Sequence, residues 1–443
     1  MNTAENSVTA GTDLQQLLQI GQRRLSGGVG WLADARRRGA EQLASMQLPD
    51  RKQEAWRYTP VSFLDQTRYE AIVDGRFEAL RLDDIEDLLL EQRDAVRLVF
   101  VNGYFAPALS SLASDHAGVT LTTLSGALGD VPAQIRARLD RIAEYRHVFA
   151  ALNSALMSDG ACILVSSGAQ VQVPIEVLHV SVGLEEPGIS HPRHLVVLED
   201  GASARLIERY CSLGDAVYFN NAMVEVELGA GSELVHERLQ EESGNAQHLS
   251  DLQVRLDERS RYRLVQATLG GAWSRSDIRI VFEGEGAEAE LDGLMLAHDK
   301  QLNDVHLDVR HNVPNCTSRE SFRGILDGKG RVVFDGRIVV ERDAQQTDAM
   351  LSNHNLMLSR SAEVDTKPQL EIYADDVKCS HGTTVGELDH DMLFYLRSRG
   401  VPEAQAKRML CEGFAQEVLD RMESPALRDR VGRHLASRLT TTV

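Results

Sequence analysis

The chain has 443 residues with 47 lysines and arginines against 66 aspartates and glutamates, so its net charge is −19. A chain of this length can bury a sizeable core and fold into two or three domains. The negative charge opposes nonspecific attraction to nucleic acid or to anionic lipid. Its five cysteines are scattered and form no CxxC pair, which argues against a disulfide framework and favours a reducing compartment.

Neither export nor membrane insertion is indicated by the residue pattern. The first residues, MNTAENSVTAGTDLQQLL, include acidic side chains and lack the apolar stretch of a secretory signal. No uninterrupted apolar run approaches the roughly 18 residues that a membrane-spanning helix needs. We therefore expect a cytoplasmic protein with no membrane span and no nucleic-acid partner.

Residues 1–150 are expected to form a mainly helical N-terminal region, because apolar residues recur at three- and four-residue spacings, as in DLQQLLQI. Within it, VRLVFVNGYF predicts a strand pair around the Asn102-Gly103 turn. The segment LPDRKQEAWRYTPVSFL looks like a loop that enters a short aromatic-anchored segment. We interpret Trp56 and Tyr58 as packing residues rather than as a binding site.

Residues 151–386 show a different pattern, with short runs of alternating apolar and polar residues such as HLVVLED and AMVEVELGAG. A similar phrase recurs at irregular intervals, as in LEDGASARLIE, LGAGSELVHE and EGEGAEAELDG. This pattern leaves a β-solenoid, a large sandwich or a propeller. We favour a parallel β-helix, because its coils tolerate uneven corners and need few hairpin turns. Asp292-Gly293, Asp327-Gly328 and Asp335-Gly336 are the exceptions that look like hairpin turns.

Residues 387–443 return to a helical period. Asp389 can cap a helix that ends near Arg399, Gly400 suits the position after that helix, and Pro402 can open the next one. The second and third helices carry apolar stripes, which are either core or a docking surface. The stripe residues are Ala406, Leu410, Phe414 and Val418 with Met409 alongside, and then Leu427, Val431 and Leu435.

The stretch DDVKCSHGTTVG places Cys379 and His381 two residues apart, so on a strand both side chains face the same side. Thiolate and imidazole both bind zinc and the iron of iron-sulfur clusters. A closed site needs about four ligands, so either distant residues or another subunit complete it, or there is no permanent metal. Equally, Cys379 can be a small buried residue and His381 a hydrogen-bonded strand end. A turn at Gly382–Thr384 would expose the thiol, and a nearby cation would then lower its pKa.

The other candidate residues carry weaker signals. His306 and His311 are five apart on a predicted strand, hence on opposite faces, and His354 and His390 are isolated. Cys316 follows a proline in a turn and is expected to be inert. The sequence contains no GxxxxGK[ST] loop, no GxSxG and no HExxH, so we expect no ATP site in this chain and no hydrolase centre.

The run NLMLSRSAEVDTKPQLEIYADDVKCSHGTTVGELDHDMLFYLRSRGVPEAQAKRMLCEGF, residues 355–414, resembles the C-terminal signature of the SufB/SufD family of iron-sulfur cluster assembly proteins. RKQEAWRYTP is similar to the N-terminal motif of that family. Within the family the chain resembles SufD-type members more than SufB, the principal scaffold. The resemblance implies a right-handed parallel β-helix flanked by N- and C-terminal helical regions, with divisions at 1–150, 151–386 and 387–443.

The resemblance also implies partners and a site. SufC, an ATPase, would dock on the C-terminal helices, SufB would pair through the β-helix, and the isolated chain would form a homodimer. A cysteine desulfurase system would supply sulfur indirectly. A transient iron-sulfur cluster or iron would lie at the SufB-SufD interface, with His381 and Cys379 as metal ligands. The candidate contacts for SufC are Tyr395, Arg399, Met409 and Phe414.

Three functions compete at this stage. The first is a non-catalytic assembly subunit, either SufD-like or SufB-like. The second is an enzyme with Cys379 as nucleophile and His381 as base, although two residues so close on one strand make a poor pair. The third is a β-helix that acts on polysaccharide through clustered carboxylates, which the cytosolic cysteine usage disfavours.

Overall fold

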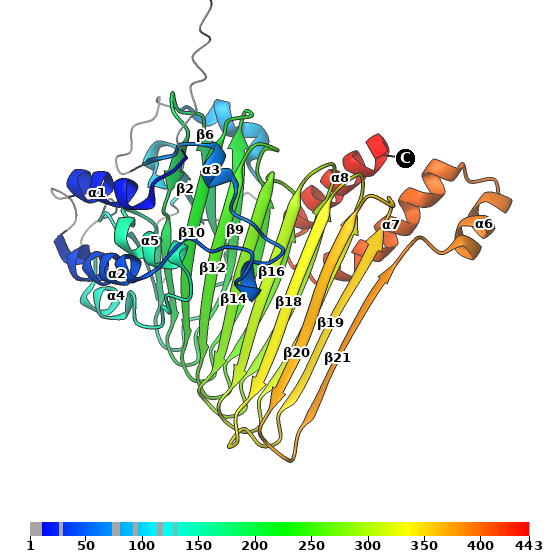
Figure 1. Ribbon diagram of the computed structural model, residues 1–443. Helices are drawn as coiled ribbons and strands as arrows, with labels where there is room; N and C mark the ends of the chain where they lie inside the picture. Colours follow the sequence, from blue (N-terminus) through cyan, green and yellow to red (C-terminus); the bar gives the residue numbers. More distant parts are fainter. Residues whose placement is uncertain are drawn as a thin grey trace, which may run out of the picture.

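The computed structural model describes residues 11–25, 30–72, 80–91, 96–112, 118–126, 128 and 131–442. The centre of the molecule is a parallel β-helix of about eight turns, with helices at the N-terminal and C-terminal parts of the chain (Figure 1). Two sheets form its walls, and from residue 193 onward successive strands alternate between them. The predicted mainly-β architecture is confirmed.

Sheet A forms one wall and contains mostly parallel strands. In spatial order its main path is β20 (Glu363–Ile372), β18 (Arg331–Val340), β16 (Leu302–His311), β14 (Trp273–Phe282), β12 (Gln247–Leu256), β10 (Tyr218–Leu228), β8 (Arg193–Leu198), β5 (Ala161–Val165) and β4 (Val119–Thr123). Off this path, β7 (Gly188–Ser190) pairs with β10, and β1 (Glu70–Ala71) pairs with β7. Strand β4 is antiparallel to β5 and ends the main path.

Sheet B forms the facing wall and is parallel except at the same end. Its order is β21 (Lys378–Gly386), β19 (Asp348–Met357), β17 (Thr317–Leu326), β15 (Glu288–Ala297), β13 (Arg261–Thr268), β11 (Glu233–Glu241), β9 (Ser203–Leu213), β6 (Ile175–Val182), β2 (Val96–Val101) and β3 (Tyr104–Phe105). The antiparallel pair of β2 and β3 confirms the predicted turn at Asn102-Gly103.

The recurring phrase of the sequence forms a corner between the two sheets. At each such corner one residue has a positive φ, and glycine adopts this conformation without a steric cost. Gly201, Gly231 and Gly286 have φ of 66°, 63° and 71°. The amide of Gly201 donates to the carbonyl of Ala230 in the next coil, and Gly231 donates in turn to Glu258, so the corners stack. The phrase therefore marks coils, although their lengths differ.

The interior between the sheets is mainly apolar, and small residues make room for large ones. A Cβ on Gly293 would overlap the Phe322 ring of the neighbouring strand, and one on Gly336 would overlap Phe334. Both glycines lie inside strands, β15 and β18. The prediction of hairpin turns at Asp292-Gly293 and Asp335-Gly336 is therefore wrong, because these glycines serve packing. Asp327-Gly328 lies between β17 and β18, which are in different sheets.

The N-terminal helices are short and cover the outer faces of the first coils (Figure 1). They are α1 (Leu14–Leu25), α2 (Ala33–Ser45), α3 (Phe63–Gln66), α4 (Ala133–Arg138) and α5 (Val148–Leu156), with the 3-10 turns η1 (Gly30–Leu32), η2 (Glu54–Trp56), η3 (Leu82–Leu88) and η4 (Pro107–Leu109). Between them run long irregular segments, so this part of the chain is less helical than its apolar spacing predicts.

The C-terminal helices are α6 (His390–Ser398), α7 (Glu403–Leu419) and α8 (Pro425–Thr442). Helices α7 and α8 pack on the outer face of sheet B. Leu427, Val431 and Leu435 are buried there, so this stripe is core rather than a docking surface. In α7, however, Cys411 and Ala415 are buried, while Leu410 and Phe414 are only half-buried. No helix among the described residues is long and apolar enough to cross a lipid bilayer.

Candidate functional site

Cys379 and His381 lie near the start of β21, the last strand of sheet B. Parallel pairing sets Cys379 beside Ala349 and His381 beside Leu351 of β19. Ala349 and Leu351 are buried in the interior, so Cys379 and His381 are on the inward side of their own strand. Both residues therefore face the lumen of the β-helix at its last coil, as the two-residue spacing predicts.

The surroundings of Cys379 differ from the sequence-based prediction. Gly382 to Thr384 continue β21 rather than forming a turn, and Cys379 is half-buried against the main core. Burial raises the pKa of the Cys379 thiol, and the carboxylates of Asp348 and Glu320 raise it further. The lowered pKa expected for an exposed thiol beside a cation is therefore wrong, because burial is the largest influence on this thiol and the hydrogen bond from the Ala349 amide only partly opposes it. The thiol is mainly protonated at neutral pH, which also disfavours a role as an enzymatic nucleophile.

His381 is exposed, whereas Leu351, its lateral neighbour on β19, is buried. On the next strand of the sheet, β17, the residue paired with Leu351 is Glu320, which is also buried. Burial raises the pKa of Glu320 to about 8, and Ser318 and Arg319 only partly oppose the shift. A largely protonated carboxylic acid thus lies in the lumen below the open last coil.

The described residues contain no group of three or more histidines, cysteines, aspartates or glutamates arranged to hold a metal ion. Cys379 and His381 are thus at most two ligands of a larger site. The other four cysteines, including Cys316, are buried. His306 faces outward and is partly exposed, whereas His311 is buried beside Phe282 and Ser318, so their opposite faces are confirmed.

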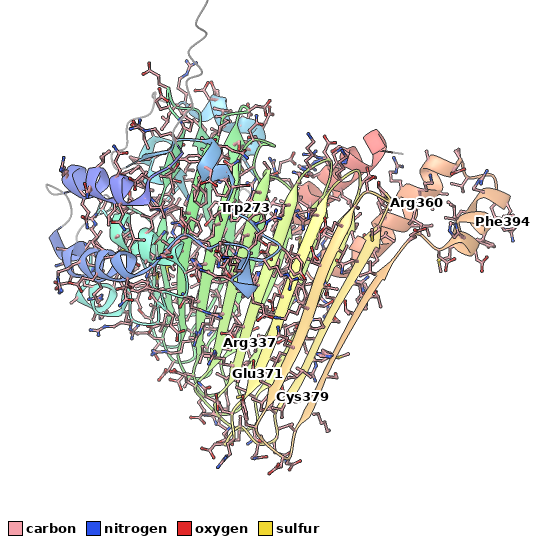
Figure 2. The ribbon with its side chains drawn as sticks, viewed as in Figure 1. Trp273, Arg337, Arg360, Glu371, Cys379 and Phe394 are labelled. Carbon is pink, nitrogen blue, oxygen red and sulfur yellow. The ribbon has the colours of Figure 1, made fainter. Side chains whose placement is uncertain are left out.

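Helix α6 projects from the body of the molecule. Phe394 lies on this projecting helix, well away from Cys379 (Figure 2). Asp389 caps it by accepting hydrogen bonds from the amides of Asp391 and Met392, and Gly400 after it has φ of 88°, both as predicted. No residue of α6 is buried. Phe394 is 73% exposed and Tyr395 57%, which is unusual for large aromatic side chains.

The four residues predicted to contact a partner differ in accessibility. Tyr395 and Arg399 are exposed and stack on each other, with 5.4 Å from the guanidinium to the ring centre. Met409 is also exposed. Phe414 instead packs on sheet B, where the Arg323 guanidinium lies 4.8 Å from its ring centre. The exposed apolar surface of this region consequently includes Met392 and Phe394 of α6, which the stripe analysis of the second helix missed.

The motif EAWRYTP forms a strap across the outer face of sheet A. Trp56 is buried, and the Arg275 guanidinium lies 3.8 Å from its ring centre. Thr59 donates a hydrogen bond to Asp304, and Lys367 of β20 forms an ion pair with Glu54. The packing role predicted for Trp56 is therefore confirmed. Tyr58 is 37% exposed and does not share it.

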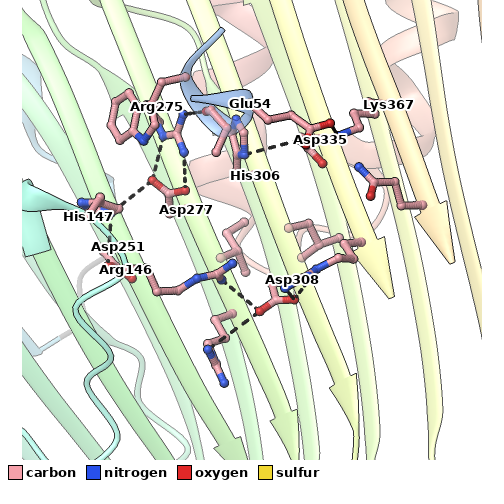
Figure 3. A pocket seen from close by; sticks show the side chains of 17 residues that line it. Glu54, Arg146, His147, Asp251, Arg275, Asp277, His306, Asp308, Asp335 and Lys367 are labelled. Carbon is pink, nitrogen blue, oxygen red and sulfur yellow. Dashed lines mark hydrogen bonds and ion pairs between the residues drawn. The ribbon is translucent and has the colours of Figure 1, made fainter. Parts of the chain in front are cut away.

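The strap encloses a charged cavity of about 270 Å³ against the outer face of sheet A (Figure 3). Its lining includes Arg146, Arg275, Arg279, Arg337 and Lys367 together with Glu54, Asp251, Asp277, Asp308 and Asp335. A second cavity of about 440 Å³ adjoins it and shares Glu54, His306, Asp335 and Lys367 with the first. Sequence reasoning missed this region, because its residues meet only after five strands pair in register. The available signal was the charge at alternate positions of IRIVF, HLDVRH and GRVVFDGR.

Comparison with known proteins identifies the chain. Residues 180–414 match the model described as SUF system FeS cluster assembly, SufBD core domain, and residues 16–177 match the SufBD protein N-terminal region. An iron-sulfur cluster assembly protein SufD of Escherichia coli is 35% identical over 90% of this chain and 91% of its own.

Two further relatives extend this likeness. An iron-sulfur cluster assembly SufBD family protein of Synechocystis sp. is 32% identical over 92% of this chain and 91% of its own. The chloroplastic protein ABCI7 of Arabidopsis thaliana is 29% identical over 89% of this chain and 84% of its own. The chain belongs to the SufBD family of iron-sulfur cluster assembly proteins.

Proposed function

We propose that this chain is the SufD-type subunit of a SufBCD scaffold complex, which builds nascent iron-sulfur clusters and passes them to acceptor proteins. Its family membership supports a role in cluster assembly, and the E. coli relative carries the name SufD. In this role the chain is a non-catalytic subunit of the cytoplasm. SufC supplies the ATPase, and a cysteine desulfurase system supplies sulfur through SufB.

The observation that carries this proposal is the open last coil. Cys379 and His381 face the lumen from β21, the strand at which sheet B ends among the described residues. Their sulfur and imidazole nitrogen suit iron, and a complete site needs about four ligands. SufB, packed against this coil, would supply the remaining ligands to a transient cluster or to iron, which is cargo rather than a resident cofactor.

The same end of the β-helix accounts for pairing. Strands β20 and β21 end the two sheets, and each has one edge with no paired strand among the described residues. Unpaired strand edges are templates for pairing with another chain. We infer that SufB occupies these edges in the complex and that a second copy of this chain occupies them in its absence, giving a homodimer.

The segment 387–443 would couple SufC to this interface. The exposed aromatic side chains of α6, with Tyr395, Arg399 and Met409, suit a docking surface, because buried aromatic anchors dominate binding energy at interfaces. Strand β21 runs from the Cys379 region to Gly386, four residues before α6 begins. ATP-driven approach of two SufC subunits would pull on α6, strain β21 and open the SufB interface, which is a two-state mechanism.

The test of the site is anaerobic co-expression with SufB and SufC, followed by absorbance and iron and sulfide analysis of the purified complex. His381→Ala should lower the cluster yield several-fold, because a ligand is lost. Ser380→Ala is the matched control, since Ser380 is the adjacent exposed residue on the opposite face of β21. A normal yield with His381→Ala, in a complex of normal composition, would remove His381 from the site.

The docking surface is tested separately by co-purification with SufC. Phe394→Asp should abolish retention of SufC, because it places a charge in an apolar contact. Val217→Asp is the control, since Val217 is an exposed apolar residue outside the C-terminal helices. Retention of SufC by Phe394→Asp would contradict docking through α6 and would leave the site proposal intact.

A further inference from the structure

The cavity beneath the strap has an unusual concentration of guanidinium groups at one end (Figure 3). In-register pairing sets Arg279 of β14 beside Asp308 of β16, and Asp308 beside Arg337 of β18. All three side chains point out of sheet A toward the cavity that they line. Arg146, from the segment before α5, reaches the same carboxylate.

Asp308 is the centre of this arginine cluster, which we define as Arg146, Arg279, Arg310 and Arg337. Its carboxylate lies 2.9 Å from Nη1 of Arg146, 3.1 Å from Nε of Arg310 and 2.9 Å from Nη2 of Arg337. Nη1 of Arg279 lies 3.8 Å away. Although burial alone would raise it, these neighbours lower the pKa of Asp308, so the carboxylate is ionised.

The arginine cluster carries more positive charge than its carboxylates neutralise. Besides Asp308, Arg279 pairs with Glu144, and Arg337 lies 3.4 Å from Glu371. Four guanidinium cations thus share three carboxylates. Each guanidinium offers five N–H donors, whereas a carboxylate accepts about four hydrogen bonds, so donors exceed acceptors.

Arg279 shows the consequence of this excess most clearly. Its side chain is only 11% exposed. Burial lowers the pKa of Arg279, and Arg310 and Arg146 lower it further, while Glu144 and Asp308 only partly compensate. A buried cation among like charges is unfavourable unless another anion is near. The positive end of the cavity is therefore incomplete in electrostatic terms, in a chain whose net charge is −19.

The acidic groups at the other end of the cavity do not supply the missing charge. Asp277 binds Arg275 through both oxygens at 2.8 and 2.9 Å, and Glu54 pairs with Lys367. Asp251 faces His147 at 3.6 Å. Asp335 lies 3.9 Å from His306. Asp277 and Glu54 are matched by cations, whereas Asp251 and Asp335 face histidines. None of these four carboxylates forms an ion pair with the arginine cluster, so the unmatched donors remain there.

We propose that the arginine cluster binds a tetrahedral oxyanion of the phosphate type, either as the free ion or as the phosphoryl group of a small molecule. The guanidinium fork matches such oxygens with paired hydrogen bonds. Gln369, opposite Arg337 on β20, adds a neutral amide donor to the lining. The adjoining cavity has a mixed lining, with Tyr58, Val333 and Val364 beside charged groups such as Arg57 and Asp365, and it gives room for the rest of a small molecule that carries the phosphoryl group. This site is independent of the proposed cluster site.

The experiment is calorimetric titration of the full-length chain with inorganic phosphate and with phenyl phosphate, at an ionic strength held constant with chloride. Wild type should bind at least one of them saturably. Arg279→Gln and Arg337→Gln should each weaken that binding at least tenfold. Arg255→Gln is the matched control. Arg255 of β12 pairs with Glu227 and Glu283 on the outer face of sheet A, but it lies outside the cavity lining.

Two results would overturn the proposal. One is the absence of saturable binding of either probe to wild type. The other is equal loss in Arg255→Gln and in the two cluster variants, which would mean general charge attraction. Circular dichroism and thermal melting establish that each variant is folded, and Arg337→Gln, at a 28% exposed side chain, keeps the test valid if Arg279→Gln does not fold. Tenfold tighter binding of phenyl phosphate than of inorganic phosphate would mean that the ligand is a phosphorylated small molecule. Equal binding of the two probes would mean that the ligand is the free ion.

Discussion

The two ends of the β-helix are finished in different ways. At the first coils, both sheets end in an antiparallel strand, β3 or β4, and helices α1 to α5 cover the outer faces. At the last coil, β20 and β21 are parallel strands whose residues are at best half-buried. A solenoid needs a cap at each end to satisfy its terminal surface. The described residues cap the first end, and the other end is where we place the partner.

The largest expected difference between the two ends is in the stability lost when a packed leucine is truncated. Leu152→Ala in α5 removes a fully buried side chain, and we expect it to lower the free energy of unfolding by about 2–5 kcal/mol. Leu370→Ala in β20 removes a half-buried side chain, and we expect a loss of about 1 kcal/mol. Urea unfolding of both variants measures the difference. Equal losses would mean that the last coil is covered in the isolated chain, for example by a second copy.

Glu320 should make stability depend on pH near the open end. Its pKa is about 8 in the folded chain, above its ordinary value of 4.5, so the folded state binds the proton more tightly than the unfolded state. The stabilisation is present in full below pH 4.5 and is lost as the pH rises through 8. Glu320→Gln stays neutral at every pH. Between pH 5 and 9 its free energy of unfolding should therefore increase relative to that of wild type.

The gain is at most about 5 kcal/mol, because the pKa of Glu320 is raised from 4.5 to about 8 and each pKa unit corresponds to about 1.4 kcal/mol. Urea unfolding of wild type and Glu320→Gln at several pH values measures it. Glu290→Gln is the control, since Glu290 is a surface residue of β15 with no comparable burial. A pH-independent difference between wild type and Glu320→Gln would show that Glu320 is ionised in the folded chain.

The smallest expected effect concerns the reactivity of a cysteine thiol rather than stability. Cys379 is half-buried, whereas the other four cysteines are buried, so it should be the first to react with iodoacetamide. Its raised pKa means that the rate should be low at pH 7 and should increase as the pH passes 9. Mass spectrometry of tryptic peptides gives the site and the rate. Rapid alkylation at pH 7 would contradict the raised pKa and would revive a nucleophilic role.

Much of the architecture could be predicted, because it depends on short-range patterns. Alternation at adjacent residues gives strands, and the Asp389 cap and Gly400 give the limits of α6. The same two-residue period places Cys379 and His381 on one face. The stripe of α7 was less predictable: Ala406 and Val418 are buried, yet Cys411 replaces Leu410, because the outer face of sheet B decides which side of the helix is covered.

The sequence by itself determined the family signature, the strand period, the helix caps and the shared face of Cys379 and His381. Only the tertiary structure decided that the thiol has a raised pKa, that α6 projects while one face of α7 is buried, and that Arg279, Asp308 and Arg337 are lateral neighbours. The physical reason is that these properties depend on register between coils. Corners of unequal length set that register. Residues that pair between coils are a whole coil apart in the chain, so no short-range sequence pattern shows which of them will be neighbours.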